Sequence, residues 1–232
     1  MASPQEHTPP PAHPASTVIL LRPSEFGFEV LLLLRAKAIK FAGGAWVFPG
    51  GRVDPADGEL ANTDTLDSLE AAKVAAARES EEEAGLFLDS SNFVYFSHWT
   101  TPLAEKKRFS TWFLLGDVTE DSNVTVDDGE IVEYKWVTPA KAIEMHRSGQ
   151  LNILPPTFLT LLELNQFTSI ADAREKVESR QPPRYFPNMV FHDNTVSVLY
   201  GDDAGYDSGD VNAPGRKHRM TMKDGCWHYV QQ

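Results

Sequence analysis

The chain has 232 residues, a formal net charge of −12 and a hydrophobic content of 41%, which is enough for a core. The acidic balance argues against sequence-independent binding to DNA or RNA, because such binding relies on Lys and Arg at phosphates. The longest apolar run, residues 30–34, is far shorter than the roughly 20 residues of a membrane span, so we expect no membrane partner. The single cysteine, Cys226, excludes an intrachain disulfide and indicates a reducing compartment.

The first fifteen residues are proline-rich and polar, and they lack the apolar stretch of a signal peptide. We expect residues 1–15 to form a disordered tail. A main domain at residues 16–180 follows, and then a β-rich extension at residues 181–232 that packs on it. The carboxyl end carries no recognisable peroxisomal address, so the cytoplasm is the expected location.

Strands and helices are predicted in a mixed order along the chain. Runs of β-branched and aromatic residues predict strands at residues 17–22, 28–35, 46–48, 93–99, 109–115 and 131–137. Capping residues and apolar spacing predict helices at residues 69–84, 138–147, 154–164 and 169–179. Shorter strands are predicted in the extension at residues 186–192, 195–200, 219–222 and 227–230. The fold class is therefore α/β (α+β).

Two glycines follow the predicted strand at residues 46–48. Gly50 and Gly51 let the backbone turn tightly and approach a ligand, because glycine tolerates conformations that other residues avoid. The acidic, turn-rich stretch at residues 52–67 is predicted to be a solvated loop.

The helix at residues 69–84 carries three carboxylates on one face. Glu79, Glu82 and Glu83 stand at positions i, i+3 and i+4, where Cβ atoms are about 5–6 Å apart. Each like-charge pair at this spacing costs about 0.2–0.5 kcal/mol, so fold stability does not explain the cluster. A divalent cation explains it, because Mg²⁺ and Mn²⁺ take oxygen ligands. The alternative is an ordinary solvated helix face.

A basic loop at residues 100–108 connects two predicted strands of this acidic chain. Either the loop is a solvated hairpin tip, or Lys106, Lys107 or Arg108 meets a substrate phosphate. His98, which lies beside several aromatic residues, is either a general base or a packed side chain.

The residues around this helix resemble the Nudix hydrolase family. The family pattern is Gly, five residues, Glu, seven residues, Arg-Glu-aliphatic-x-Glu-Glu-x-Gly-aliphatic. Residues 70–86 match it in register, with Glu70 as the first glutamate, and Phe48-Pro49-Gly50-Gly51 is similar to the glycine loop of the family. Gly51 and Glu70 are 19 positions apart instead of six, so thirteen residues are inserted between them. Ser80 stands where the pattern has an aliphatic residue.

The resemblance implies a Nudix fold, in which a mixed β-sheet is sandwiched between helices, here with a carboxy-terminal helical and strand-rich extension. It also implies a Mg²⁺ or Mn²⁺ cofactor, with Glu79, Glu82, Glu83 and a carbonyl of Gly50 as ligands. The expected general base is Glu82, Glu83 or Glu130.

Other residues take supporting roles under the resemblance. Glu130 is a candidate base because many family members have a carboxylate just before such a strand, and Glu133 is the second choice. Arg78 stays protonated, so we expect it to fix the glutamate side chains by hydrogen bonds. Glu70 is expected to steady the helix against the glycine loop, and Gly85 to end the helix. The candidate substrate-binding residues are Arg35, Gly51 and Arg108.

The implied reaction is hydrolysis of a diphosphate bond in a small nucleotide-type substrate. Leu33-Leu34-Arg35 and the long insertion are similar to the coenzyme A-cleaving branch of the family, whose substrates are coenzyme A or acyl-coenzyme A. Alternative substrates are ADP-ribose, a dinucleotide or a sugar nucleotide. A non-catalytic nucleotide-binding module and a cation-buffering surface are alternatives from other classes, although no EF-hand spacing supports the latter. Because Nudix proteins often form dimers, a homodimer is one expected assembly.

Overall fold

The structure is a computed structural model that describes residues 10–25 and 27–232. Most of the predicted tail therefore lies outside the described residues. The prediction is wrong for the end of the tail, because strand β1 (Ala12–Ser24) already begins at Ala12. Pairing on both sides explains the early start: the Pro14 carbonyl accepts a hydrogen bond from Val53 N–H, and His13 pairs with Phe109 of a neighbouring strand.

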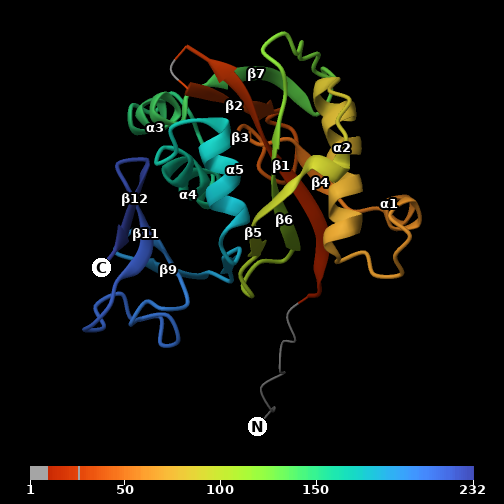
Figure 1. The fold of residues 1–232 in the computed structure, drawn as a ribbon. Coiled ribbons are helices and arrows are strands. Elements are labelled where there is room, and N and C mark those ends of the chain that lie inside the picture. The colour runs from red at the N-terminus through yellow and green to blue at the C-terminus, as the bar shows by residue number, and fades with distance from the viewer. Residues whose placement is uncertain (1–9, 26) are drawn as a thin grey trace.

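A mixed eight-stranded sheet forms the centre of the molecule (Figure 1). After β1, its strands are β2 (Gly27–Arg35), β3 (Trp46–Val47), β4 (Gly50–Arg52), β5 (Val94–Thr100), β6 (Arg108–Asp117), β7 (Ile131–Val137) and β8 (Arg184–Tyr185). The strand order is β3-β2-β1-β6-β5-β8, while β4 pairs with β1 and β7 pairs with β2. The β1–β6 and β5–β8 pairs are parallel. The predicted mixed sheet is therefore confirmed.

Helices cover both faces of this sheet (Figure 1). The helices are α1 (Pro55–Leu60), α2 (Leu69–Ala84), α3 (Pro139–Arg147), α4 (Pro155–Leu164) and α5 (Ile170–Glu178). One hydrophobic cluster joins Val18 and Leu20 to α2, and a larger one joins Ile19 and Leu21 to α4 and its neighbours. The side chains of successive β1 residues thus pack against helices on opposite faces of the sheet, as the two-residue period of a strand requires.

The helix ends follow the capping residues of the sequence. Ser68, Thr138 and Ser169 each accept a hydrogen bond from a first-turn N–H at the start of α2, α3 and α5. Gly85 ends α2 in the left-handed conformation, with a φ of 67°. The predicted caps at Thr138, Ser169 and Gly85 are confirmed. No described helix is both long and apolar enough to cross a bilayer.

The carboxy-terminal residues form a second, antiparallel sheet in the order β12-β11-β10-β9. Its strands are β9 (Asn188–His192), β10 (Thr195–Leu199), β11 (His218–Lys223) and β12 (Cys226–Gln231). Trp227 joins this sheet to the helical layer, because its backbone N–H donates to His146 Nε2 at 2.9 Å and its indole N–H to the Ile153 carbonyl at 3.0 Å. Trp227 also belongs to the larger hydrophobic cluster, so the extension shares a core with α3 and α4.

Candidate active site

Gly50 and Gly51 begin β4 directly after the chain turns from β3, and this Gly50–Gly51 turn brings the backbone against the carboxyl half of α2. The Gly50 N–H donates a hydrogen bond to Glu83 Oε2 at 2.9 Å. A Cβ atom at Gly50 would collide with the backbone of Ser16 on β1, and one at Gly51 would collide with the Glu79 carboxylate. Gly50 therefore needs glycine because backbone surrounds it, whereas a side chain at Gly51 would require the Glu79 carboxylate to move.

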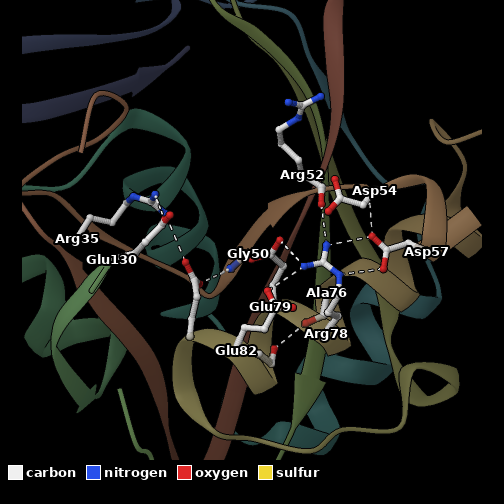
Figure 2. Close-up of polar contacts among 12 residues, drawn as sticks. Arg35, Gly50, Arg52, Asp54, Asp57, Ala76, Arg78, Glu79, Glu82 and Glu130 are labelled. Atoms are coloured by element: carbon white, nitrogen blue, oxygen red, sulfur yellow. Dashed lines mark hydrogen bonds and ion pairs between the residues drawn. The ribbon is translucent and has the colours of Figure 1, made fainter. Parts of the chain in front are cut away.

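Arg78 binds three carboxylates and one carbonyl through its five N–H groups (Figure 2). Its Nε and Nη2 donate to the two oxygens of Asp57, each at 3.0 Å. Its Nη1 donates to Glu79 Oε1 at 2.9 Å and to Glu82 Oε2 at 3.0 Å. The second Nη2 hydrogen bond reaches the Arg52 carbonyl at 2.9 Å, which ties α2 to the end of β4.

Asp57 is the partner of Arg78 that the sequence analysis missed. Residues 52–67 were predicted to be a solvated loop, but they contain α1, and the Asp57 side chain is 1% exposed. Glu70, which was expected to steady the helix, is instead exposed in the first turn of α2. Asp57 stands six positions after Gly51, as the first acidic residue of the family pattern does. The thirteen inserted residues therefore follow this acidic position instead of preceding it.

Ser80 fits its buried position because its hydroxyl group has a partner. Its Oγ donates to the Ala76 carbonyl one turn earlier at 2.7 Å, and the residue is fully buried. This hydrogen bond satisfies the polar group where the family pattern has an aliphatic side chain.

Arg35 holds the other side of the acidic cluster (Figure 2). It stands at the end of β2, and its Nη1 lies 3.4 Å from Glu83 Oε1 while its Nη2 donates to Glu130 Oε2 at 2.8 Å. Glu130 precedes β7, and its side chain is 59% exposed. Asp127 fixes this approach to β7 by accepting hydrogen bonds from the N–H groups of residues 129–131. Glu133 pairs with Lys135 instead.

Burial makes two of the glutamates hard to ionise. The Glu83 side chain is 8% exposed, and burial raises its pKa to about 8 despite the opposing hydrogen bond from Gly50 and the charge of Arg35. Negative charge on Glu79 and Glu130 contributes to the increase. Burial also raises the pKa of Glu79, against the influence of Arg78. A positive ion is the group that would compensate these carboxylates once they are ionised.

The donor set suits a hard divalent cation. Five carboxylates, those of Asp57, Glu79, Glu82, Glu83 and Glu130, share the two guanidinium groups of Arg35 and Arg78. No closed cluster of three or more potential ligand side chains occurs in the part of the chain that the structure describes. The arginines explain this, because Arg78 draws Glu79 and Glu82 to one side while Arg35 and Gly50 hold Glu83 on the other.

Arg108 is not brought to this site, contrary to its prediction as a substrate-binding residue. It is 7% exposed, and it donates to the Thr101 carbonyl at 3.1 Å and to the Pro10 carbonyl at 2.9 Å. These hydrogen bonds hold the Arg108 guanidinium at the base of the loop before β6, away from the acidic cluster. His98 is also buried: its ring packs edge-on against Trp112, its Nε2 lies 3.1 Å from Ser110 Oγ, and burial lowers its pKa.

A comparison with protein-family models matches the NUDIX domain over residues 11–156, which is more than half of the chain. The chain belongs to the Nudix family. The match includes the glycine loop, the inserted segment, α2 and Glu130. It confirms the resemblance stated on the sequence, and it confirms that the protein is a Nudix-type hydrolase.

Curated relatives of this Nudix protein include proteins named acyl-coenzyme A diphosphatase NUDT19 from a frog, a bird and Homo sapiens. The Xenopus laevis protein is 27% identical over 156 residues, a match that covers 56% of this chain and 41% of that protein. The Homo sapiens protein is 25% identical over 319 aligned positions, which cover 96% of this chain and 83% of that protein. The match to the frog protein thus spans less than half of that relative.

A solved structure supports the same fold. The Nudix hydrolase from Alicyclobacillus acidocaldarius superposes with a TM-score of 0.65 at 22% identity, over 74% of this chain and 99% of that one. The predicted Nudix fold, with a mixed sheet between helices, is confirmed.

The two candidate positions for the first acidic residue of the Nudix pattern are distinguished by Asp57→Asn and Glu70→Gln. Asp57→Asn removes the buried one of the three carboxylates that bind Arg78, and we expect a loss of about 1–3 kcal/mol in the free energy of unfolding. Glu70→Gln is expected to stay within about 0.5 kcal/mol of the unmodified protein, because the residue is exposed. Urea unfolding measures both changes, and equal stability of the two variants would contradict the assignment of Asp57.

Gly51→Ala tests the close approach of the turn to Glu79. The added methyl group must displace the Glu79 carboxylate, and we expect turnover to fall about 10- to 100-fold, as for other small displacements of reactive groups. Gly201→Ala is the matched control, because a Cβ atom there meets nothing within 4 Å. Steady-state kinetics with a thermal unfolding curve for each variant measures the effect. Full activity of Gly51→Ala would rule out a functional role for this contact.

Proposed function

We propose that this Nudix hydrolase cleaves a diphosphate bond in coenzyme A or an acyl-coenzyme A and that it depends on Mg²⁺ or Mn²⁺. The observation that carries the proposal is the position of Glu79 and Glu83 against the Gly50–Gly51 turn, within reach of Arg35 and Arg78. Glutamates at i, i+3 and i+4 on one helix face, held by arginines, suit a cation and a polyphosphate.

The proposed metal ligands are Glu79, Glu82 and Glu83, with a Gly50 carbonyl as an additional donor. A bound Mg²⁺ or Mn²⁺ neutralises phosphate charge and makes a bound water more acidic. Arg78 keeps the side chains of Glu79 and Glu82 in place, and Asp57 fixes the orientation of the Arg78 guanidinium. Gly51 lets the Glu79 carboxylate lie directly against the backbone of β4, because a Cβ atom there would overlap with it.

Glu130 is the group that we assign as general base. Arg35 holds its Oε2 at 2.8 Å, whereas its side chain is 59% exposed and so is open to water. Its Oε1 is the proposed acceptor of the proton of the attacking water. Glu83 is buried and bound to Gly50, and Glu82 is a proposed metal ligand, so Glu130 is the carboxylate left to accept the proton. Arg35, which stays charged, is the proposed contact for a substrate phosphate oxygen.

The choice of coenzyme A rests on the relatives named as acyl-coenzyme A diphosphatases. It also rests on Arg35, which stands before the glycine loop and contacts the acidic cluster. A panel of coenzyme A, acetyl-coenzyme A, ADP-ribose, a diadenosine polyphosphate and UDP-glucose with Mg²⁺ tests the choice. We expect the highest kcat/KM for a coenzyme A compound, with adenosine 3′,5′-bisphosphate as product. A clear preference for ADP-ribose, or binding without product, would overturn the proposal.

Glu79→Gln and Glu82→Gln are expected to lower kcat/KM about 100-fold or more, because loss of a metal ligand removes several kcal/mol of transition-state stabilisation. Glu81→Gln is the matched control: it lies on the same helix, and its side chain is exposed. Steady-state kinetics at saturating Mg²⁺ measures kcat/KM for the three variants, and circular dichroism checks that each is folded. Turnover that survives in both Glu79→Gln and Glu82→Gln would contradict the proposed metal site.

Metal binding is expected to release a proton at neutral pH. The metal-free Glu83 has a pKa raised to about 8, so its carboxyl group is mostly protonated at pH 7 and must lose the proton to become a ligand. Affinity for Mg²⁺ should therefore rise with pH up to about 8 and level off above it. The stability of the metal-free protein changes with pH in the opposite direction to its Mg²⁺ affinity. Glu83 holds its proton more tightly in the folded state than in the unfolded state, where the pKa of a glutamate is about 4.3. The free energy of unfolding should therefore fall as the pH rises from about 5 to 8.

Calorimetry of Mg²⁺ binding at pH 7 in two buffers of different ionisation enthalpy measures this proton release. Glu83→Gln should abolish the release, whereas Glu81→Gln should leave it unchanged. Binding of Mg²⁺ without any proton release at pH 7 would contradict the role of Glu83.

A further inference from the structure

Two loops that are distant in the sequence meet beside the amino-terminal end of β1. One is the loop between β2 and β3, residues 36–45, and the other is the loop between β5 and β6, residues 101–107. The Phe41 ring lies 5.0 Å from the Phe109 ring, centroid to centroid, and Lys107 Nζ lies 5.1 Å from the centroid of Phe109. Phe41 is 43% exposed, so an aromatic surface beside a cation remains open to solvent.

The base of the second loop is held in place by hydrogen bonds. Thr101 N–H donates to the Phe109 carbonyl at 2.9 Å, and Phe109 N–H donates to Thr101 Oγ1 at 3.0 Å. The buried Arg108 adds its hydrogen bonds to the carbonyls of Thr101 and Pro10. Arg108 therefore anchors this loop, while Lys106 and Lys107 at its tip stay exposed.

The charge on these loops is opposite to that of the whole chain. The chain has a formal net charge of −12, yet the two loops carry Lys37, Lys40, Lys106 and Lys107 against the single acid Glu105. All four lysines are exposed, and within the described residues no ion pair includes any of them. A lysine cluster without acidic partners suits an anion, and the exposed ring beside it suits a nucleobase.

The distance to the acidic cluster fits a nucleotide. On β1, His13 pairs with Phe109 and Ser16 pairs with Gly51. The aromatic pair is thus three residues from the Gly50–Gly51 turn along β1, or about 10 Å at the usual rise of a strand, and this odd spacing places the two on opposite faces of the sheet. The loop that carries Phe41 begins beside the acidic cluster, because Arg35 contacts Glu83 and the Ala36 N–H donates to the Glu130 carbonyl at 2.8 Å. A nucleotide that follows this loop passes around the end of the sheet. A ribose can join a base at the first position to a diphosphate at the second.

We propose that these loops bind the adenosine 3′-phosphate end of coenzyme A, with the base against Phe41 and the 3′-phosphate at Lys106 and Lys107. This inference rests on the diphosphatase function proposed above and extends it to substrate selection. ADP-ribose and diadenosine polyphosphates lack the 3′-phosphate on the adenosine ribose, so the lysines would favour coenzyme A over them. The alternative for Lys106 and Lys107 is an ordinary solvated loop tip.

Coenzyme A and dephospho-coenzyme A differ only in the 3′-phosphate, so they isolate its contribution. We expect the combined variant Lys106→Ala/Lys107→Ala to lower kcat/KM for coenzyme A about tenfold and to leave dephospho-coenzyme A within about twofold. Phe41→Ala should lower both about tenfold, because stacking does not depend on the phosphate. Lys223→Ala, at the exposed end of β11, is the matched control and should change neither. An equal effect of the lysine variant on both substrates, or no effect, would overturn the inference.

Binding of the product fragment separates this inference from the proposed function. Calorimetry is expected to show adenosine 3′,5′-bisphosphate binding about tenfold more tightly than AMP, an advantage that Lys106→Ala/Lys107→Ala removes. If this preference holds in a protein that does not hydrolyse coenzyme A, the proposed function fails and the subsite stands. If coenzyme A is hydrolysed but neither the preference nor the lysine effect is found, the subsite fails and the function stands.

Discussion

The ion pair between Arg78 and Asp57 is the contact on which the candidate active site depends. The Asp57 carboxylate is 1% exposed and accepts two hydrogen bonds from the guanidinium, which fixes its plane. The remaining N–H groups then point at Glu79, Glu82 and the Arg52 carbonyl. One side chain thus ties the inserted segment, the glycine loop and the helix together. A lysine could not replace it, because an ammonium group has no planar fork of donors.

The same arrangement leaves the site short of positive charge. Arg35 and Arg78 face five carboxylates, and burial keeps Glu83 protonated up to about pH 8. A site with this excess of negative charge favours the binding of a divalent ion. The arginines keep the glutamate side chains in position for that ion. The lysine-bearing loops near Phe41 lie outside this acidic region, where they offer the positive charge that an anionic nucleotide needs in an acidic protein.

The parts of the site that depend on local spacing could be predicted from the sequence. Positions i, i+3 and i+4 place Glu79, Glu82 and Glu83 on one helix face in any helix, and Gly50–Gly51 marks a turn by composition alone. Asp57 was missed because the pattern was matched to Glu70, although Gly51 and five residues before Asp57 gave the same signal. The burial of Arg108 and the early start of β1 depend on pairing with distant strands, which spacing in one sequence does not reveal.

The position of the metal tests the central claim most directly. Crystals soaked in Mn²⁺ give an anomalous peak that locates the ion without reference to activity. We expect a peak in contact with carboxylate oxygens of Glu79, Glu82 and Glu83 beside the Gly50–Gly51 turn, with the pair between Arg78 and Asp57 intact. A manganese ion bound elsewhere, or bound with Arg78 detached from Asp57, would contradict this account of the site.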